Sequence, residues 1–449
     1  MEKNREITKF DLIFLIILMG FAFFRYSIMA IIVASYPFIE TEFSLSFFEL
    51  SLINVIFYSV SFFSSYFWLY LAGKTSNSIA FISGSLLWMI PVMLISLSKS
   101  FFMFIFFVAL VGAGTESTNI VLYNYFIGLK FNRTFARAYS LITIVQGAGG
   151  VFGAFFTAQI QDIMDLEWRM VFFYIFLIII SLWFIIAFII LFRPKKLNVV
   201  MTNKKSYSIT FLRLIQIIKQ KKNLLVYLIL IISSVGLSYL NVWTQKYFQT
   251  VHGVSQTISV ISFIFLSGGE FLAYVVGGFV FDKLRKMNNK IFPYLGFLSL
   301  FISAILFTIS LSIPWILEEV AGENFIEICW NLLLSAFNDI KIALFYISIF
   351  LAFFSFTFSI PFLIGVLNFT NNHEDRNVLI YVWNTLLVVL YLIFPPIGGI
   401  IADNFGLRIM FFVIPFSLYF ALIPIISLTK ITKSLYNTTD IFSKDIEIN

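Results

Sequence analysis

The sequence predicts an all-α membrane protein with twelve transmembrane helices in two pseudo-symmetric six-helix bundles. Of its 449 residues, 60% are hydrophobic and only 12% are charged, and the mean hydropathy is +0.96, a composition outside the range of soluble globular domains. Nearly charge-free stretches long enough to cross a bilayer, about 20 residues each, recur along the chain. One long polar segment divides them into two sets of six.

Each predicted span is an apolar stretch between charged residues. The spans are residues 10–35, 48–72, 78–98, 101–127, 138–160, 170–192, 223–249, 256–281, 291–315, 341–368, 377–402 and 408–430. Lys3 and Arg5 precede the first stretch, which is too long for the core of a signal peptide and lacks a small-residue cleavage site. We therefore expect the first span to be retained.

Basic and acidic residues alternate between successive gaps. The basic gaps hold Lys74, Lys130, Arg133, Arg137, the 193–222 segment, Lys283, Arg285, Lys286, Lys290 and Arg376. The other gaps hold Glu40, Glu42, Asp162, Asp165, Glu167, Glu318, Glu319, Glu323, Glu327 and Asp403. Since Lys and Arg collect in cytoplasmic loops, we expect both termini to be cytoplasmic.

Four regions follow from these spans. Residues 1–193 form the N-terminal six-helix bundle, 194–222 a cytoplasmic linker, 223–430 the C-terminal bundle and 431–449 a cytoplasmic tail. Within the linker, residues 207–222 carry apolar side chains at helical spacing, as in a helix on the membrane surface. A flexible basic linker is the alternative.

The two halves resemble each other internally. After the fifth span the chain reads Gln161-Asp162 and then Trp168-Arg169-Met170-Val171-Phe172-Phe173. After the eleventh it reads Ala402-Asp403 and then Leu407-Arg408-Ile409-Met410-Phe411-Phe412. Arg133 and Arg137 precede the fifth span, as Arg376 precedes the eleventh. Parallel repeats of this kind relate the halves of one large class of membrane proteins.

Several function classes do not fit this composition. Cys329 is the only cysteine and the two histidines lie far apart, which excludes an internal disulfide and a Cys/His metal site. The basic residues flank membrane spans, so the net charge of +7 does not indicate nucleic-acid binding. An enzyme site would need clustered His, Asp or Ser groups at a membrane face. We expect no enzyme activity, no cofactor, no metal and a monomer.

Two loop motifs carry a resemblance to the major facilitator superfamily. They are Gly73-Lys74-Thr75-Ser76-Asn77 after the second span and Gly278-Phe279-Val280-Phe281-Asp282-Lys283-Leu284-Arg285-Lys286 after the eighth. The first lacks the family's acidic residue. The resemblance implies a fold of two six-helix bundles in which such loops lock the inward face. The expected gating residues are Gly73, Lys74, Arg133, Arg137, Asp282, Lys283, Arg285 and Arg376.

Three further motifs resemble particular members of that superfamily. Gly112-Ala113-Gly114-Thr115-Glu116-Ser117 is similar to a stretch in lysosomal dipeptide-transporting members and to a related one in spinster lipid carriers. Organic-anion and monocarboxylate members share the Trp168-Arg169 turn. They also share a glycine-rich fifth span, represented here by Gly147, Gly149, Gly150 and Gly153. Plain helix packing is the favoured interpretation of these glycines, and of Pro395-Pro396 and Gly398-Gly399 in span eleven.

Four ionisable residues lie within the spans, where a charge costs several kcal/mol unless it is paired or hydrated. Arg25 lies about 22 Å into the first span at a rise of 1.5 Å per residue. Glu116 reaches a similar depth from the other side, Glu270 is near the middle of span eight, and Lys246 is near the outer end of span seven. The resemblance implies that spans one, four, seven and ten line a central cavity.

Each of these residues has a structural alternative. Arg25 and Glu116 form a permanent ion pair in one interpretation and bind substrate and a proton in the other. Lys246 can extend to the lipid headgroups, and Glu270 can be a buried, protonated carboxyl. Polar neighbours that complete a site are Tyr26, Asn119, Tyr123, Gln146, Tyr239, Asn241, Gln245, Trp383 and Asn384.

The predicted function is secondary active transport of a small carboxylate-bearing solute by alternating access. Charges of both signs in one cavity suit a zwitterion, so an amino acid or short peptide is favoured. Desolvation raises the pKa of a carboxyl and a nearby cation lowers it, so Glu116 and Glu270 are the candidates for proton coupling. The alternatives are a monocarboxylate or organic-anion carrier, a spinster-like lysolipid carrier and a transport-dead receptor.

Overall fold

The computed structural model describes residues 9–128, 135–192, 216–287, 291–315, 325–371 and 373–446, and within these ranges it contains helices and no strands. The chain forms two compact units, each described by itself. Unit 1 comprises Met1–Ser206, Ser255–Val260 and Glu323–Phe325. Unit 2 comprises Tyr207–Val254, Ile261–Gly322 and Ile326–Asn449.

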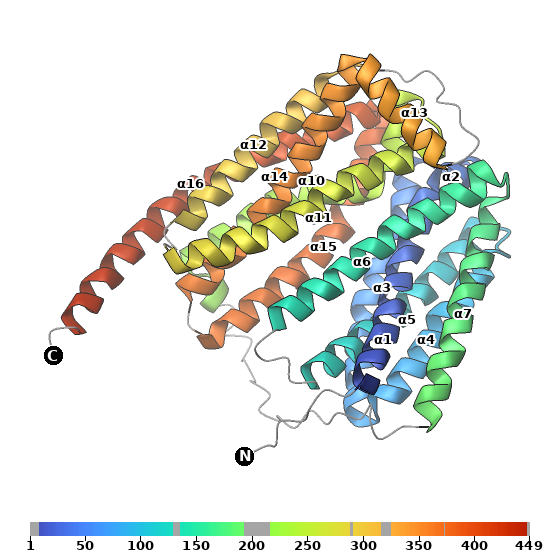
Figure 1. Cartoon of the computed structure of the whole chain (residues 1–449), viewed down its shortest axis with the longest axis horizontal. Helices are drawn as coiled ribbons and strands as arrows, with labels where there is room; N and C mark the ends of the chain where they lie inside the picture. The colour runs from blue at the N-terminus through green and yellow to red at the C-terminus, as the bar shows by residue number, and fades with distance from the viewer. Residues whose placement is uncertain are drawn as a thin grey trace. The chain divides into compact units, whose positions relative to one another are not determined.

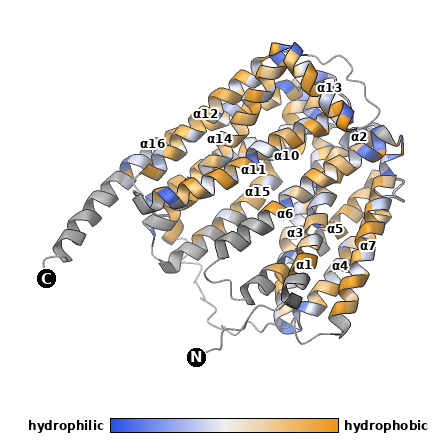
Figure 2. Cartoon of the chain, in the orientation of Figure 1, coloured by the Kyte–Doolittle hydropathy of each residue, from blue (hydrophilic) through white to orange (hydrophobic). Residues whose placement is uncertain are grey.

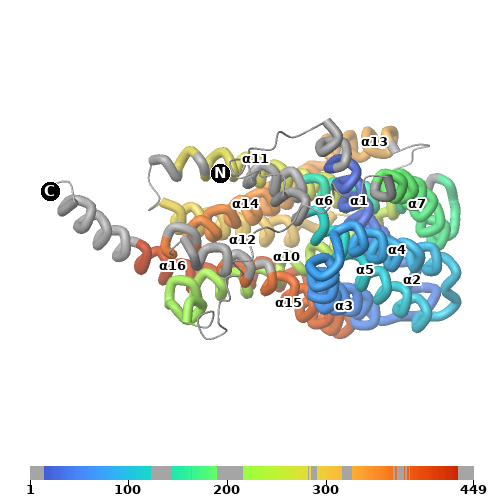
Figure 3. Tube along the Cα trace, turned by 90° about the horizontal axis from the view of Figure 1, so that it is seen from below, coloured from blue at the N-terminus to red at the C-terminus, as the bar shows by residue number. Residues whose placement is uncertain are grey.

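Unit 1 is built from seven α-helices and one π-helical turn in its described part (Figure 1). They are α1 (Lys9–Ala34), α2 (Tyr36–Phe43), α3 (Phe47–Lys74), α4 (Asn77–Ile95), α5 (Phe101–Gly128), α6 (Phe135–Ala158), η1 (Gln159–Ile163) and α7 (Trp168–Phe192). α6 packs along α1, while α3 and α4 both pack on α5, and Figure 3 shows α3, α4 and α5 side by side. Apolar helices of this kind bury one stripe on each neighbour, which fixes their order in the bundle.

Unit 2 contains most of the remaining helices. They are α10 (Lys221–His252), α11 (Gln256–Met287), α12 (Phe292–Ser312), α13 (Phe325–Asn338), α14 (Ile340–Thr370), α15 (His373–Phe405) and α16 (Leu407–Ile446). α12 packs between α14 and α16, and α10 packs against α15 and α16. Gly269 lets α11 approach α14, because a Cβ there would lie 2.8 Å from the carbonyl oxygen of Phe350.

Eleven helices of the described part are long and apolar enough to cross a membrane. Apolar residues run along these helices and hydrophilic residues gather mostly at their ends (Figure 2). These helices match eleven of the twelve predicted spans. The remaining predicted span, 138–160, corresponds to α6. α6 also has the length to span a bilayer.

Three boundaries differ from the prediction. A short helix, α2, follows the first span at once because Pro37 begins a new helix. The last helix continues to Ile446, past the predicted end of its span at 430. Of the predicted surface helix at 207–222, only the part from Gln216 is described, and α10 begins at Lys221.

The glycines of α6 fall into two groups. A Cβ at Gly149 would lie 2.1 Å from the carbonyl oxygen of Phe23 on α1, and one at Gly153 would lie 2.2 Å from that of Ser27. Gly147 and Gly150 have no atom within 4 Å of such a Cβ. Two of the four glycines therefore allow α1 and α6 to touch backbone to backbone, as helix packing predicts.

Arg169, at the start of α7, links α7 to α2 and to the segment that follows α4. Its Nη1 donates to Glu42 Oε2 at 2.6 Å, its Nη2 donates to Glu42 Oε1, and Nη2 also reaches the carbonyl of Ser98 at 2.7 Å. Trp168 Nε1 donates to the same carboxylate at 2.7 Å. The hydrogen bond from Arg169 lowers the pKa of the Glu42 carboxyl, and that from Trp168 adds to the effect. We call Glu42, Ser98, Trp168 and Arg169 the Arg169 clasp.

The first turn of α11 belongs to unit 1 because its side chains bond there. Gln256 Nε2 donates to the carbonyl of Ala34 at 2.6 Å. The amide and hydroxyl of Thr257 donate to Asp162 Oδ2 at 2.6 and 2.7 Å. A carboxylate thus accepts from the amino end of a helix, where the unpaired N–H groups favour negative charge.

α13 is too short to be among the eleven membrane-crossing candidates, and its apolar residues form two stripes. Ile328 and Leu332 are buried, whereas Ile326, Trp330 and Phe337 are exposed at helical spacing. Cys329 lies half-buried between them, and burial raises the pKa of its thiol.

Candidate functional site

The clearest site in the described part of unit 1 is an ion pair between two membrane-spanning helices. Nη2 of Arg25 on α1 donates to Oε1 of Glu116 on α5. Arg25 is 8% exposed, and the Glu116 side chain is 20% exposed. The ring of Tyr26 lies 4.8 Å from the Arg25 guanidinium carbon, a cation–π contact. The two charges that sequence placed at similar depth are therefore direct partners.

Two more helices contribute polar groups to the same carboxylate. Ser61 Oγ on α3 donates to Glu116 Oε1 at 3.0 Å, and Asn119 Nδ2, one turn along α5, donates to Oε2 at 3.3 Å. Gln146 Nε2 on α6 reaches Asn119 Oδ1 at 3.5 Å. Side chains from α1, α3, α5 and α6 thus meet in one network, which we call the Glu116 cluster: Arg25, Ser61, Glu116, Asn119 and Gln146.

The glycines before Glu116 explain how α5 enters this cluster. A Cβ at Gly112 would lie 2.5 Å from the carbonyl oxygen of Phe57 on α3, and one at Gly114 would lie 2.6 Å from that of Gly84 on α4. The Gly-x-Gly motif therefore lets α5 pack against both neighbours. Glu116, half a turn beyond Gly114, is held beside α1 and α3 as a result.

The cluster places two opposite charges where little of either side chain is exposed to solvent. Three side chains donate to the Glu116 carboxylate. Arg25 Nε, by contrast, is buried and has no hydrogen-bond partner in the described part of the chain. A guanidinium offers five N–H donors in a fork that matches a carboxylate. The geometry can therefore accept a second carboxylate at Arg25, or exchange one for the other.

The described residues that were predicted in the C-terminal half have separate settings. Tyr239 and Trp383 are buried, and the Tyr239 ring packs so tightly that a Cβ at Gly398 would lie 2.7 Å from it. Asn241 donates to the hydroxyl of Tyr391 at 2.7 Å. Lys246 is half-buried near the end of α10.

Glu270 has a different setting from Glu116. It is half-buried in α11, next to the close contact between Gly269 and α14. Within the described residues no hydrogen bond or ion pair reaches its carboxyl. It is therefore a membrane-embedded carboxyl without a fixed partner in that part of the chain.

Only part of the predicted gate can be placed. Gly73 and Lys74 end α3, where Lys74 Nζ lies 5.5 Å from the Tyr70 ring centre, and Lys283 is exposed near the end of α11. Arg133 lies outside the described residues, as do the side chains of Tyr123, Arg137, Asp282, Arg285, Arg376 and Asn384. The substrate-binding role of Tyr123 and Asn384 and the gating role of the other residues stay predictions.

Sequence reasoning missed Ser61. Serines are common in apolar helices, where the hydroxyl returns to the helix's own backbone, as Ser64 and Ser65 do here. Nothing in the local pattern distinguishes Ser61 from these neighbours. Only the packing of α3 on α5 shows that its hydroxyl donates a hydrogen bond to Glu116.

The comparisons with known proteins agree with this architecture. The sequence model of the Major Facilitator Superfamily matches residues 16–337, and no curated protein matches the chain. A bacterial homologue of the human lysosomal transporter spinster, in an inward-facing and occupied conformation, is 14% identical with a TM-score of 0.68, covering 94% of this chain and 96% of its own.

A second solved structure is similar to the same extent. The nucleoside transporter NupG is 10% identical with a TM-score of 0.67, covering 93% of this chain and 99% of its own. Likenesses at such low identity establish the fold alone.

Proposed function

The chain belongs to the Major Facilitator Superfamily, a family of membrane transporters, and we propose that it carries a small carboxylate-bearing solute by alternating access. An amino acid or a short peptide is the favoured substrate. The observation that supports this most is the buried Arg25, which holds Glu116 through one nitrogen and keeps Nε without a partner in the described part of the chain.

The proposed binding step is an exchange of carboxylates at Arg25. A substrate carboxylate that bonds the guanidinium fork competes with Glu116 for the same positive charge. Glu116, once displaced into a poorly hydrated site, binds a proton more readily because desolvation disfavours its charged form. Ser61 and Asn119 then hold the protonated side chain near its original place. Substrate binding and proton binding are thereby coupled at one pair of residues.

Glu270 is the proposed second proton carrier. A half-buried carboxyl with no ion pair or hydrogen bond among the described residues has no fixed charge nearby to keep it ionised. It can therefore change protonation without breaking a structural contact. A substrate ammonium is a suitable transient partner for it, in keeping with a zwitterionic solute.

The proposed orientation places both termini in the cytoplasm, from the alternation of basic and acidic gaps. The ends of α10 and α12 and the starts of α14 and α16 then lie on the opposite side. Transport in this scheme moves the two bundles around a midplane site, as in other carriers built from parallel repeats.

Uptake into proteoliposomes tests the role of Arg25. We expect Arg25→Ala to weaken transport of carboxylate-bearing substrates about tenfold or more, while amides of the same substrates change little, because only the acid uses the guanidinium. Lys99→Ala, which removes an exposed cation between α4 and α5, is the matched control. Equal weakening of acids and amides would identify the pair as purely structural.

A second assay separates proton coupling from substrate binding. We expect Glu116→Gln to abolish uptake driven by a pH gradient and to leave counterflow of labelled substrate largely intact. Equal loss of both activities would remove the proposed proton role. Flux of lysolipids but not of amino acids or peptides would favour the lipid-carrier alternative, and absence of any flux would favour a receptor.

A further inference from the structure

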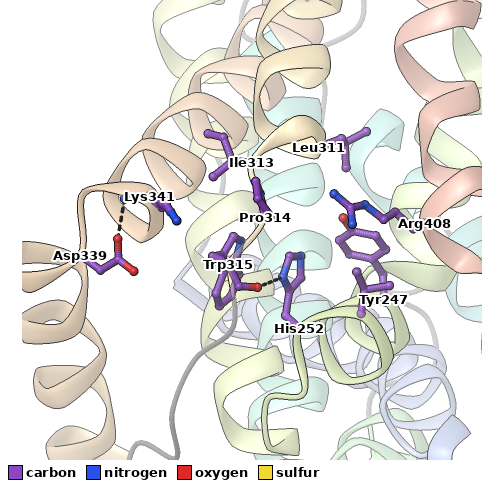
Figure 4. A pocket seen from close by; sticks show the side chains of 10 residues that line it. Tyr247, His252, Leu311, Ile313, Pro314, Trp315, Asp339, Lys341 and Arg408 are labelled. Carbon is purple, nitrogen blue, oxygen red and sulfur yellow. Dashed lines mark hydrogen bonds between the residues drawn. The ribbon is translucent and has the colours of Figure 1, made fainter.

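Unit 2 contains a cavity at the end where α10 and α12 finish and α14 and α16 begin (Figure 4). Its volume is about 460 Å³, and every residue that lines it belongs to unit 2. The cavity is far along the chain from the Glu116 cluster, which lies wholly in unit 1. It also involves none of the residues proposed above to carry substrate or protons.

The floor of the cavity is a stacked pair of rings. His252 and Trp315 lie parallel, with ring centres 4.0 Å apart and an angle of 12° between their planes. His252 Nδ1 donates to the carbonyl of Trp315 at 2.9 Å, because a carbonyl oxygen can only accept. Both rings are 4% exposed. This contact holds the two rings against each other and uses only one of their three ring nitrogens.

The other two ring nitrogens are unsatisfied in the described part of the chain. His252 Nε2 and Trp315 Nε1 are buried and have no hydrogen-bond partner there. In a neutral imidazole whose Nδ1 carries the hydrogen, Nε2 is an acceptor, whereas indole Nε1 is a donor. Buried polar groups cost free energy when unpaired. A ligand group that both donates and accepts hydrogen bonds would therefore satisfy both nitrogens, after a small rotation of the two rings.

The charges around the cavity are mainly positive. Arg408 extends from the start of α16 towards the cavity beside Tyr247, and Lys341 lies on the opposite side, near Asp339 (Figure 4). Asp339 Oδ1 accepts from the backbone amide of Lys341 at 2.8 Å. In the described part of the chain, no hydrogen bond or ion pair engages the side chain of Arg408 or Lys341. Two cationic side chains and one carboxylate thus line the cavity. The carboxylate, Asp339, already caps the amino end of α14.

The corresponding place in unit 1 is occupied by a carboxylate. Arg169 is the second residue of α7, as Arg408 is the second residue of α16. Ser98 follows the end of α4 by three residues, and Trp315 follows the end of α12 by three. In unit 1 the Ser98 carbonyl and the Glu42 carboxylate both bind Arg169.

Unit 2 uses these parts differently. His252 takes the carbonyl of Trp315, and in the described part of the chain no acidic side chain binds Arg408 as Glu42 binds Arg169. The arginine is retained, it has no paired anion among the described residues, and it lines a cavity.

We propose that this cavity binds an oxyanion, with Arg408 and Lys341 as its cationic ligands, at the position that corresponds to the Glu42 carboxylate in unit 1. Phosphate is favoured over a carboxylate because a singly protonated phosphate group donates to His252 Nε2 while it accepts from Trp315 and Arg408. The phosphate belongs either to a soluble anion or to the phosphomonoester headgroup of a lipid such as phosphatidic acid, since the cavity lies at the end of four membrane-spanning helices.

Thermal unfolding of the purified full-length protein tests the proposal for a soluble anion. We expect inorganic phosphate to raise Tm more than chloride does at equal ionic strength, and more than acetate does. Arg408→Gln and Lys341→Gln should each weaken the apparent phosphate affinity on the order of tenfold or more. Lys430→Gln, which removes an exposed cation of α16 outside the cavity, is the matched control.

Native mass spectrometry tests the lipid source on the same variants. Retention of phosphatidic acid over phosphatidylcholine by the wild type, lost in Arg408→Gln but not in Lys430→Gln, supports a headgroup as the ligand. Val251→Glu, which places a carboxylate on the cavity wall as Glu42 does in unit 1, should remove both phosphate and lipid effects without lowering Tm. Equal responses of the wild type, Arg408→Gln and Lys430→Gln in both experiments would overturn the proposal.

Discussion

The two units treat a membrane-embedded carboxyl in opposite ways. In unit 1, Glu116 accepts hydrogen bonds from Arg25, Ser61 and Asn119. In unit 2, Glu270 has no hydrogen bond or ion pair among the described residues. The first carboxyl lies in a network of donors from α1, α3 and α5, and the second has no such network among the described residues. The comparison underlies the proposed roles, in which Glu116 couples substrate and proton at Arg25 while Glu270 is a second proton carrier.

The largest expected effect comes from breaking the Glu116 cluster on one side only. Arg25→Met or Glu116→Met alone should destabilise the protein by about 3–5 kcal/mol, because each leaves an uncompensated buried charge. The double variant should recover most of that loss, since a well-packed apolar pair replaces a buried ion pair at little cost. Thermal or denaturant unfolding of the three variants in detergent measures this. Additive losses in the double variant would contradict a direct pair.

The glycines of α6 give the next largest effect and an internal control. Gly149→Ala and Gly153→Ala should each cost about 1–3 kcal/mol, because the new methyl group meets the backbone of α1. Gly147→Ala and Gly150→Ala should be neutral or stabilise by up to about 1 kcal/mol through helix propensity. The Tm values of the four variants test this difference. Similar losses at all four positions would show that flexibility, and not contact with α1, requires glycine.

Glu270→Gln should change stability by no more than about 1 kcal/mol, because no partner among the described residues is left unpaired. Its effect belongs to transport: uptake driven by a pH gradient should lose its dependence on pH. Unfolding and uptake measured on the same preparation test both halves of this statement. A loss of stability as large as that of Glu116→Met would mean that Glu270 has a structural partner.

The smallest effect concerns the Arg169 clasp. The pKa of Glu42 is lowered in the folded protein, so its contribution to stability is present above the pKa of an unfolded glutamate, about 4.3, and is lost as pH falls through the lower folded value. Glu42 is partly exposed, and such pairs contribute about 0.2–1 kcal/mol. The stability advantage of wild type over Glu42→Gln should therefore shrink on acidification below about pH 4. An advantage that is constant from neutral to acidic pH would show that Glu42 acts only through packing.

Hydropathy and loop charge were enough to predict the helical membrane fold, because each of the twelve spans is an apolar stretch between charged residues. The fifth span is among the helices predicted in this way and corresponds to α6. Depth along the helices suggested Arg25 and Glu116 as partners, since two charges at one level of a bundle have few other ways to be satisfied.

Other features had no signal in the sequence. Ser61 contributes to the Glu116 cluster only because of the angle at which α3 meets α5. The cavity beside Arg408 depends on His252 taking a carbonyl, and a lone histidine at a helix end gives no hint of that bond. The repeat did align Arg169 with Arg408, but the contrast between the paired Arg169 and Arg408, which has no paired carboxylate among the described residues, became visible only when the hydrogen bonds were known.

The single cysteine of α13 gives this protein a built-in reporter. Because Cys329 is the only thiol in the chain, a fluorophore or spin label attached there marks one position without prior engineering. Its half-burial and raised pKa slow the reaction with such reagents at neutral pH. The rate of labelling therefore reports local opening of α13. Adding candidate solutes one at a time would show which of them changes that rate.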